Sequence, residues 1–268
     1  MKIQKLPAIF RWIVLVLLFA ACNPVKDFTF VQMCDTQLGM SDYHTDSAAF
    51  QQAVRQINEL KPDLVLICGD LVNHPDDHSY SDFKAIRSGF DMPCYCIAGN
   101  HDIMNEPTDS SLTYYRNQIG EDYYQVEHKG VVFVIVNTQL WKSQLKKASE
   151  KHDQWVSQTI QACAKKGEPL IVAGHYPLYT ENPDEEEHHF NLPIRKRKEL
   201  LNLFEANNVQ AYLSGHTHQL VINTYHNIQL VSGETTSVNI NKRPKGFRLW
   251  HVSKDTLTNE FVPLLPVK

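Results

Sequence analysis

Residues 63–73 read DLVLICGDLVN, and this stretch decides the fold that we predict. Its first six residues have the length and composition of a buried strand, and a glycine and an aspartate follow at once. Two more strand-like runs accompany it, FTFVQMC at 28–34 and PCYCIA at 93–98. Helical patterns over 46–60 and 80–90 separate the three runs. This βαβαβ order predicts parallel strands that are covered by helices.

The second half of the chain is richer in strands. Residues 122–138 read as two strands joined at Lys129-Gly130, which predicts an antiparallel pair. A helical pattern over 147–166 stops at Gly167, a residue suited to ending a helix. After it we expect a strand, a helix, a strand and a β-rich closing segment, at 169–175, 192–208, 210–216 and 219–263. No linker divides these runs, so we predict one α/β domain with two β-sheets packed together and helices outside.

The overall composition of the chain argues against some classes of function. The chain has 268 residues, of which 43% are hydrophobic and 21% charged, with a net charge of −4. An acidic protein is poorly suited to binding a nucleic-acid polymer, and we expect no such partner. The six cysteines, at positions 22, 34, 68, 94, 96 and 163, form no CxxC zinc pattern. For the five after Cys22 we expect buried thiols, and the alternative is disulfides, which export would permit.

The N-terminal segment has the features of an export signal. Lys2, Lys5 and Arg11 precede an apolar run, residues 12–21, that is too short to span a bilayer. Small residues before Cys22 resemble a bacterial lipoprotein box, which implies a cleaved signal peptide over 1–21 and a lipid on Cys22. A plain signal peptide or an N-terminal anchor is the alternative.

Residues 22–27 are then a tether, and residues 28–268 form the single folded domain. The corresponding location is the bacterial cell envelope, with the protein lipid-anchored and facing the periplasm or the surface. The membrane is therefore an expected partner, through the lipid on Cys22.

Metal-ligating residue types follow five of the predicted strands. In α/β sheets, ligands bind beyond the carboxyl ends of the strands, so these side chains are expected to converge. A lone Gly-Asp or Gly-His pair is an ordinary turn, but five segments of this kind at strand ends in one chain, four of them with a glycine before the donor, predict a shared metal site. The five segments contain Asp35 with Gln37, Asp70 with Asn73, Asn100 with His101 and Asp102, His175, and His216 with His218.

This ordered set, D-x-[H/Q], GDxxN, GNHD, GH and GHxH, resembles the calcineurin-like metallophosphoesterases over residues 35–218. The resemblance implies an α/β four-layer αββα sandwich, two mixed β-sheets packed face to face with helices outside. It implies a centre of two divalent metal ions, with Asp70 bridging them. The first metal would be held by Asp35, Gln37 and His218, and the second by Asn100, His175 and His216.

The same resemblance implies a mechanism. A hydroxide held by the metals attacks the phosphorus, and His101, oriented by Asp102, protonates the leaving oxygen. No protein nucleophile is needed.

Gln37 departs from the commoner histidine in the first motif. An amide oxygen is a harder donor than an imidazole and suits Mg²⁺, Mn²⁺ or Fe²⁺ better than Zn²⁺, so we expect Mn²⁺ among these four. The alternative is that Gln37 only forms a hydrogen bond near the site. The D-x-Q form also resembles a subgroup of calcineurin-like serine/threonine-protein phosphatases.

Several substrates and other functions stay open. A phosphomonoester or phosphoprotein is favoured, and the alternative is a phosphodiesterase acting on nucleotides, cyclic nucleotides or phospholipid head groups. A non-catalytic binding module and a purely structural metal site are further alternatives, although structural zinc sites usually use cysteine.

The acidic segment 181–190 is either a solvated loop or a lid that brings His188 or His189 to the substrate. The basic run 194–199 is expected to be a solvated helix face. Three further candidates for lining the pocket are Tyr176, Tyr179 and His74.

Overall fold

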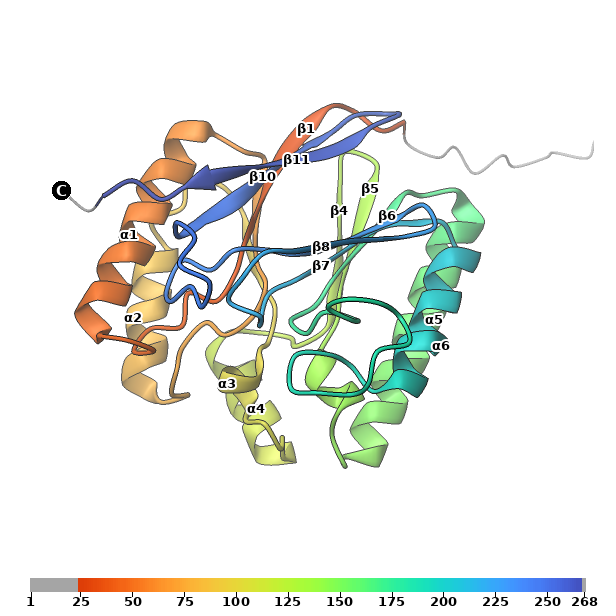
Figure 1. The fold of residues 1–268 in the computed structure, drawn as a ribbon, viewed down its shortest axis with the longest axis horizontal. Coiled ribbons are helices and arrows are strands. Elements are labelled where there is room, and N and C mark those ends of the chain that lie inside the picture. The colour runs from red at the N-terminus through yellow and green to blue at the C-terminus, as the bar shows by residue number, and fades with distance from the viewer. Residues whose placement is uncertain (1–23, 267–268) are drawn as a thin grey trace, which may run out of the picture.

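A computed structural model describes residues 24–266. The predicted signal segment and its Cys22 lie outside these residues. Within the described range, none of the helices combines the length and apolar character needed to cross a bilayer. The chain forms two sheets with helices on their outer faces (Figure 1).

The first sheet contains three parallel strands and an antiparallel pair, in the order β11-β10-β1-β2-β3. The parallel strands are the predicted ones, β1 (Phe28–Met33), β2 (Leu64–Ile67) and β3 (Cys94–Cys96). The closing strands β10 (Gly246–Val252) and β11 (Leu257–Pro263) extend this sheet next to β1. The expected βαβαβ unit is confirmed.

The second sheet has the order β4-β5-β6-β7-β9-β8. Its central strands β5, β6, β7 and β9 run parallel, and β4 and β8 are antiparallel edges. The strands span β4 (Tyr124–His128), β5 (Val131–Ile135), β6 (Leu170–Ala173), β7 (Val209–Ser214), β8 (Val221–Tyr225) and β9 (Ile228–Ser232). Both sheets are therefore mixed, as predicted.

Two helices cover the outer face of each sheet (Figure 1). The first sheet packs against α1 (Tyr43–Leu60) and α2 (Asp77–Arg87), and the second against α5 (Lys146–Lys166) and α6 (Ile194–Ala206). Helices α1 and α2 begin three residues before the predicted ranges because Asp42 and Asp76 cap their N-termini through side-chain oxygens. Gly167 ends α5 in the left-handed conformation, as its position predicted.

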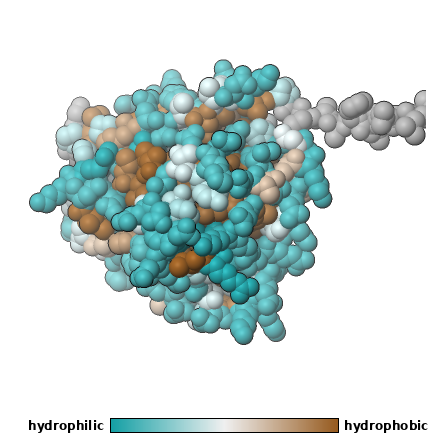
Figure 2. Space-filling model, turned by 45° about the vertical axis from the view of Figure 1, so that its right-hand side comes forward, coloured by the Kyte–Doolittle hydropathy of each residue, from teal (hydrophilic) through white to brown (hydrophobic). Residues whose placement is uncertain are grey.

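A third apolar layer lies between the sheets. The Phe30 ring stacks on Trp250 at 5.6 Å between centroids and meets Phe133 of the other sheet edge-on at 5.2 Å. These aromatic contacts join the two sheets face to face, and the four-layer αββα sandwich is confirmed. The face in Figure 2 is largely hydrophilic, with hydrophobic patches between the polar side chains.

Three short helices were not predicted from the sequence. They are α3 (Asn100–Ile103), α4 (Asp109–Gln118) and the 3₁₀ helix η1 (Thr138–Trp141). α3 and η1 are four residues long, too short for a periodic apolar pattern to reveal them. The five described cysteines are buried free thiols, as expected: Cys34, Cys68, Cys94, Cys96 and Cys163.

Candidate metal centre

The predicted ligands follow the carboxyl ends of parallel strands, where such sheets bind ligands. Asp35 and Gln37 follow β1, and Asp70 follows β2. Asn100 opens α3 just beyond β3, and the three histidines follow β6 and β7. All of these side chains are buried. Segments far apart in the sequence therefore place their polar side chains in one interior region.

The backbone at this region is strained in a way that aims the side chains. Five ligand positions adopt the left-handed conformation, with φ between 34° and 67°. For residues other than glycine this conformation costs roughly 1–3 kcal/mol each and is concentrated at functional sites. The five are Asp35, Gln37, Asp70, His216 and His218. Strain at these five positions indicates that local backbone stability is lost so that the five side chains can point into the site.

Two groups of donors form within this region, and Asp70 belongs to both. One group is Asp70, His175 and His216, and the other is Asp35, Asp70 and His218. Within each group the ligand atoms lie within 4.8 Å of one another. A carboxylate shared by two groups has the geometry needed to bridge two cations. The structure thus brings together the residues that the sequence predicted for each metal.

Hydrogen bonds fix which nitrogen each histidine offers. His175 Nδ1 lies 2.8 Å from the Cys68 carbonyl, and His218 Nδ1 lies 2.7 Å from the Val238 carbonyl. Each Nδ1–H therefore donates to the backbone, and each Nε2 is left as the ligand atom. His216 is the reverse, because its Nε2 lies 3.2 Å from the His189 carbonyl. Such backbone partners orient metal-binding imidazoles in known metal sites.

Gln37 fits a ligand role through an unsatisfied atom. Its Nε2 donates to Asn73 Oδ1 at 3.2 Å, while its Oε1 is buried and has no hydrogen-bond partner among the described residues. A buried carbonyl oxygen without a partner is costly, and a cation would satisfy it. Asn100 Oδ1 lies 3.0 Å from His175 Nε2, so these two donors also face each other. The donor set of carboxylates, amide oxygens and imidazoles fits two divalent cations.

The buried donor groups perturb one another's protonation. Burial opposes a charge on His175, but the Asp70 carboxylate outweighs it and raises the pKa of His175 to about 9. Burial raises the pKa of Asp35, although His218 and His175 oppose this effect. Burial lowers the pKa of His216 far below its usual value. Acidic and imidazole groups thus share protons here, and metal binding would displace those protons.

His101 lies beside Asp70 but is not oriented by Asp102, which corrects the expectation from the resemblance. The His101 backbone N–H donates to Asp70 Oδ1 at 2.9 Å, and its Nδ1 lies 3.0 Å from the Asn73 carbonyl. The Asn73 carbonyl therefore fixes the imidazole and leaves Nε2 available.

Asp102 instead forms hydrogen bonds with the loops that carry the ligands. Its buried carboxylate accepts the backbone N–H groups of Leu71 at 2.9 Å, Val72 at 3.3 Å and Gly99 at 2.8 Å. These bonds tie the loop after β2 to the loop after β3. Asp102 is therefore placed to position ligands rather than to contact a substrate.

Two glycines are required by close packing in this region. A Cβ on Gly69 would collide with the His175 ring, and a Cβ on Gly99 would collide with Asp70. Gly69 also has φ of 84°, which side chains rarely adopt. These two glycines therefore let His175 and Asp70 lie close to the backbone of the neighbouring strand ends.

The secondary candidates separate into three groups. Tyr176 lies against the site, with its ring centroid 3.9 Å from that of His216. Tyr179 is buried in the core under the second sheet. His74 is exposed and lies 3.2 Å from the Asn73 amide.

The basic run 194–199 is not simply a solvated face, since Arg197 is fully buried. Sequence reasoning also missed Lys142, which lies over the Tyr176 ring at 4.5 Å from its centroid. No local pattern marks either residue, because the burial of Arg197 and the placement of Lys142 both depend on how the loop before α6 folds.

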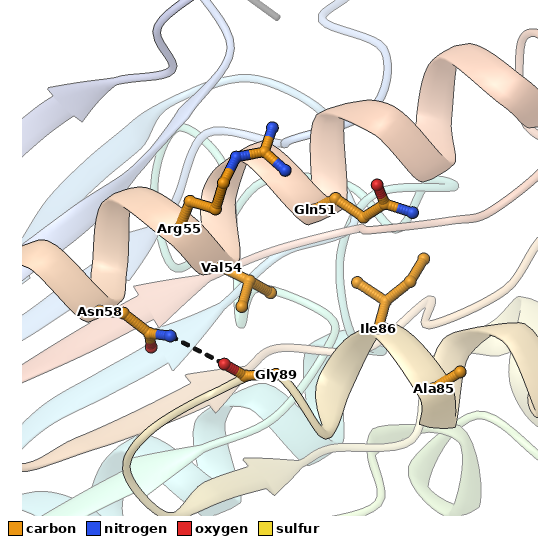
Figure 3. Close-up of a pocket in the computed structure, with 7 residues that line it drawn as sticks. All are labelled: Gln51, Val54, Arg55, Asn58, Ala85, Ile86 and Gly89. Carbon is orange, nitrogen blue, oxygen red and sulfur yellow. Dashed lines mark hydrogen bonds between the residues drawn. The ribbon is translucent and has the colours of Figure 1, made fainter.

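A separate pocket of about 410 Å³ lies between α1 and α2, lined by residues such as Val54, Arg55 and Ile86 (Figure 3). Asn58 Nδ2 donates to the Gly89 carbonyl at 2.7 Å across its rim. None of the seven lining residues is a carboxylate, imidazole or thiol. The pocket therefore lacks the chemistry found at the strand ends.

Comparisons with known proteins agree with this geometry. The profile described as calcineurin-like phosphoesterase matches residues 37–220. The chain belongs to the calcineurin-like phosphoesterase family. Its fold is shared with a solved dimetal phosphatase from Danio rerio, with a TM-score of 0.68 and 14% identity over 90% of this chain and 97% of that one.

Two curated relatives in this family differ in their named activity. The human serine/threonine-protein phosphatase CPPED1 is 29% identical over 244 residues, which cover 86% of this chain and 77% of that protein. A probable cyclic nucleotide phosphodiesterase of Psychrobacter arcticus is 22% identical over 180 residues, or 64% of this chain and 63% of that protein. The predicted reaction class is confirmed: this calcineurin-like protein is a metal-dependent phosphoesterase.

Proposed function

We propose that this phosphoesterase hydrolyses phosphomonoesters, with phosphoserine and phosphothreonine side chains of proteins as the substrate class. The named activity of the human relative supports the protein substrate. The observation that carries the proposal is that Asp70 belongs to both donor groups. With Asp70 in both groups, these residues would hold two cations that share one ligand, which suits the clamping of a phosphoryl group by two metals.

Different residues of the chain have different roles in binding the two metals. Asp35, Gln37 and His218 would hold one cation, Asn100, His175 and His216 would hold the other, and Asp70 would be shared by both. Bound there, the two cations supply Lewis-acid polarisation of the phosphoryl oxygens and activation of water.

His101 Nε2 donates a proton to the leaving oxygen, while the Asn73 carbonyl holds the ring through Nδ1. Asp102 keeps the two ligand loops together through backbone N–H groups. All of the donor side chains are buried, so bulk water is excluded from around them.

For the metal, we propose Mn²⁺ in the Gln37 position. The unsatisfied Gln37 Oε1 supports this choice, since an amide oxygen suits a hard cation better than Zn²⁺. Elemental analysis of the purified protein, followed by reconstitution with single metals, identifies the resident pair.

A second candidate is a phosphodiesterase for cyclic nucleotides, which the similarity to the Psychrobacter arcticus protein favours. Turnover of p-nitrophenyl phosphate, bis(p-nitrophenyl) phosphate, a phosphoserine peptide and a cyclic nucleotide with Mn²⁺ separates the candidates. A preference for the first and third substrates supports the proposal, and a preference for the second and fourth contradicts it.

We further propose that lipid on Cys22 anchors the enzyme in the bacterial envelope. The basic residues, the apolar run and the small residues before Cys22 support this location. Replacing Cys22 with Ser should move the protein from the membrane fraction to the soluble fraction, and unchanged membrane association would contradict lipidation.

A further inference from the structure

The segment between β6 and α6 forms a loop of fixed internal shape, seen in blue-green at the lower centre of Figure 1. Near its middle, the Glu185 carboxylate accepts hydrogen bonds from backbone N–H groups at the start of the loop and from a side-chain amide near its end. The donors are Thr180 N at 2.8 Å, Glu181 N at 2.6 Å, Asn182 N at 3.2 Å and Asn191 Nδ2 at 2.7 Å. Partial burial opposes ionisation, but these bonds lower the pKa of Glu185 to about 2. We call residues 180–192 the acidic loop.

Arg197 holds this acidic loop against α6. Its buried guanidinium donates to the carbonyls of Pro183 at 3.0 Å, Glu185 at 2.9 Å and Leu192 at 2.9 Å. A buried guanidinium that lost these acceptors would be left without compensation, which is strongly unfavourable. The acidic loop therefore has a defined position and is more than a solvated connection.

The tip of the acidic loop lies against a metal ligand. The His189 carbonyl accepts from His216 Nε2 at 3.2 Å, and the two imidazole centroids are 4.9 Å apart. The His189 ring is exposed and makes no hydrogen bond among residues 24–266.

Lys142 completes this side of the site from another part of the chain. Its half-buried ammonium donates to the Asn191 carbonyl at 2.7 Å and lies over the ring of Tyr176, which packs on His216. An ammonium carries three donors, and the described structure uses one of them. Lys142 and His189 therefore keep unused N–H groups on the side of the metal centre where Tyr176 and His216 lie.

We propose that Lys142 and His189 form an anion-binding wall that selects dianionic phosphomonoesters over singly charged phosphodiesters. This inference rests on the proposed function and adds the residues that determine its specificity. A monoester phosphate carries most of a second negative charge at neutral pH, because its second pKa is about 6. Charge-assisted hydrogen bonds to that extra charge strengthen monoester binding and give a diester, which lacks it, little benefit.

The first test compares two esters of the same alcohol. Lys142→Met and His189→Ala are assayed on p-nitrophenyl phosphate and bis(p-nitrophenyl) phosphate with the metal-loaded protein. We expect kcat/KM for the monoester to fall about tenfold or more and that for the diester to fall less than about twofold. Equal losses on both esters, or no loss on the monoester, would overturn the proposal.

Matched controls separate contact with substrate from damage to the loop. His188→Ala removes the adjacent imidazole, whose Nε2 lies 3.3 Å from Glu185 Oε1. Lys147→Met removes an exposed lysine of α5. Both controls should keep the monoester preference. Loss of that preference in His188→Ala to the same degree as in His189→Ala would show that loop structure alone is responsible, and the proposal would fail.

A binding measurement keeps the inference distinct from the proposed function. Calorimetric titration of metal-loaded protein with inorganic phosphate should give about tenfold weaker binding in Lys142→Met and His189→Ala, with metal content unchanged. Unaltered phosphate affinity in both variants would contradict the proposed anion-binding wall. If the wild-type protein hydrolysed neither ester yet bound phosphate through these residues, the proposed function would fail while the anion site would stand.

Discussion

Asp70 Oδ2 lies 3.2 Å from His175 Nε2, and both side chains are almost fully buried. This pair connects the two sheets, because Asp70 follows β2 of the first sheet and His175 follows β6 of the second. The metal centre is thus assembled at the junction of the sheets. Its geometry depends on their packing as much as on the local motifs.

Replacing Asp70 with Asn should remove the shared ligand charge. We expect loss of about one metal equivalent or more and a fall in kcat/KM of at least about 100-fold, since changes outside the ligand shell alone cost about 10–100-fold. Elemental analysis and p-nitrophenyl phosphate turnover measure the two effects. Asp77→Asn, on the exposed start of α2, is the control. Robust turnover by Asp70→Asn would contradict the bridging role.

Replacing His101 with Asn should lower kcat without changing the metal content. General acid catalysis contributes about 10²–10⁴-fold, and it matters less when the leaving group is stable as an anion. The loss should therefore be larger for phenyl phosphate than for p-nitrophenyl phosphate. A loss that is the same for both leaving groups would argue against proton donation by His101.

Replacing Gln37 with His should tighten the first metal position and shift its preference toward Zn²⁺. The buried Oε1 that has no partner is the reason to expect a direct metal contact. Competition with a chelator should show about tenfold stronger retention of Zn²⁺ in the variant. Gln37→Leu should instead lose one metal equivalent. Unchanged metal affinity in both variants would show that Gln37 is not a ligand.

Acid should destabilise the protein through His152. Its ring is fully buried, and burial together with the charge of Lys196 lowers its pKa to about 3. The unfolded chain binds a proton near pH 6.5 and the folded chain does not, so this contribution is complete above about pH 6.5 and decreases as the pH falls toward 3.

The size of that loss can be measured by urea unfolding. Between pH 8 and pH 5.5, His152 should account for a decrease of about 1.4 kcal/mol in the free energy of unfolding. His152→Gln retains an acceptor for the Asn137 N–H and should reduce the pH dependence by that amount. An identical pH dependence in the variant would show that His152 is not responsible.

Much of the site could be predicted from the sequence because its ligands are encoded locally. Each ligand follows a short apolar strand, and parallel strands end at the same edge of a sheet, so one pattern gives both the fold and the convergence. The Asp35, Asp70 and His175 segments are examples. The role of Asp102 was less accessible, because its partners are backbone N–H groups that no spacing in the sequence reveals.

The sequence by itself determined the alternation of strands and helices, the order of the metal motifs and hence the chemical class. Tertiary structure decided which imidazole nitrogen is offered, that Asn73 orients His101, and that Arg197 is buried. It also placed Lys142 and His189 beside His216. The physical reason is the sequence distance over which each effect acts. Periodicity and turn chemistry act over a few residues, whereas these contacts form between segments that become neighbours only when the sheets and loops pack.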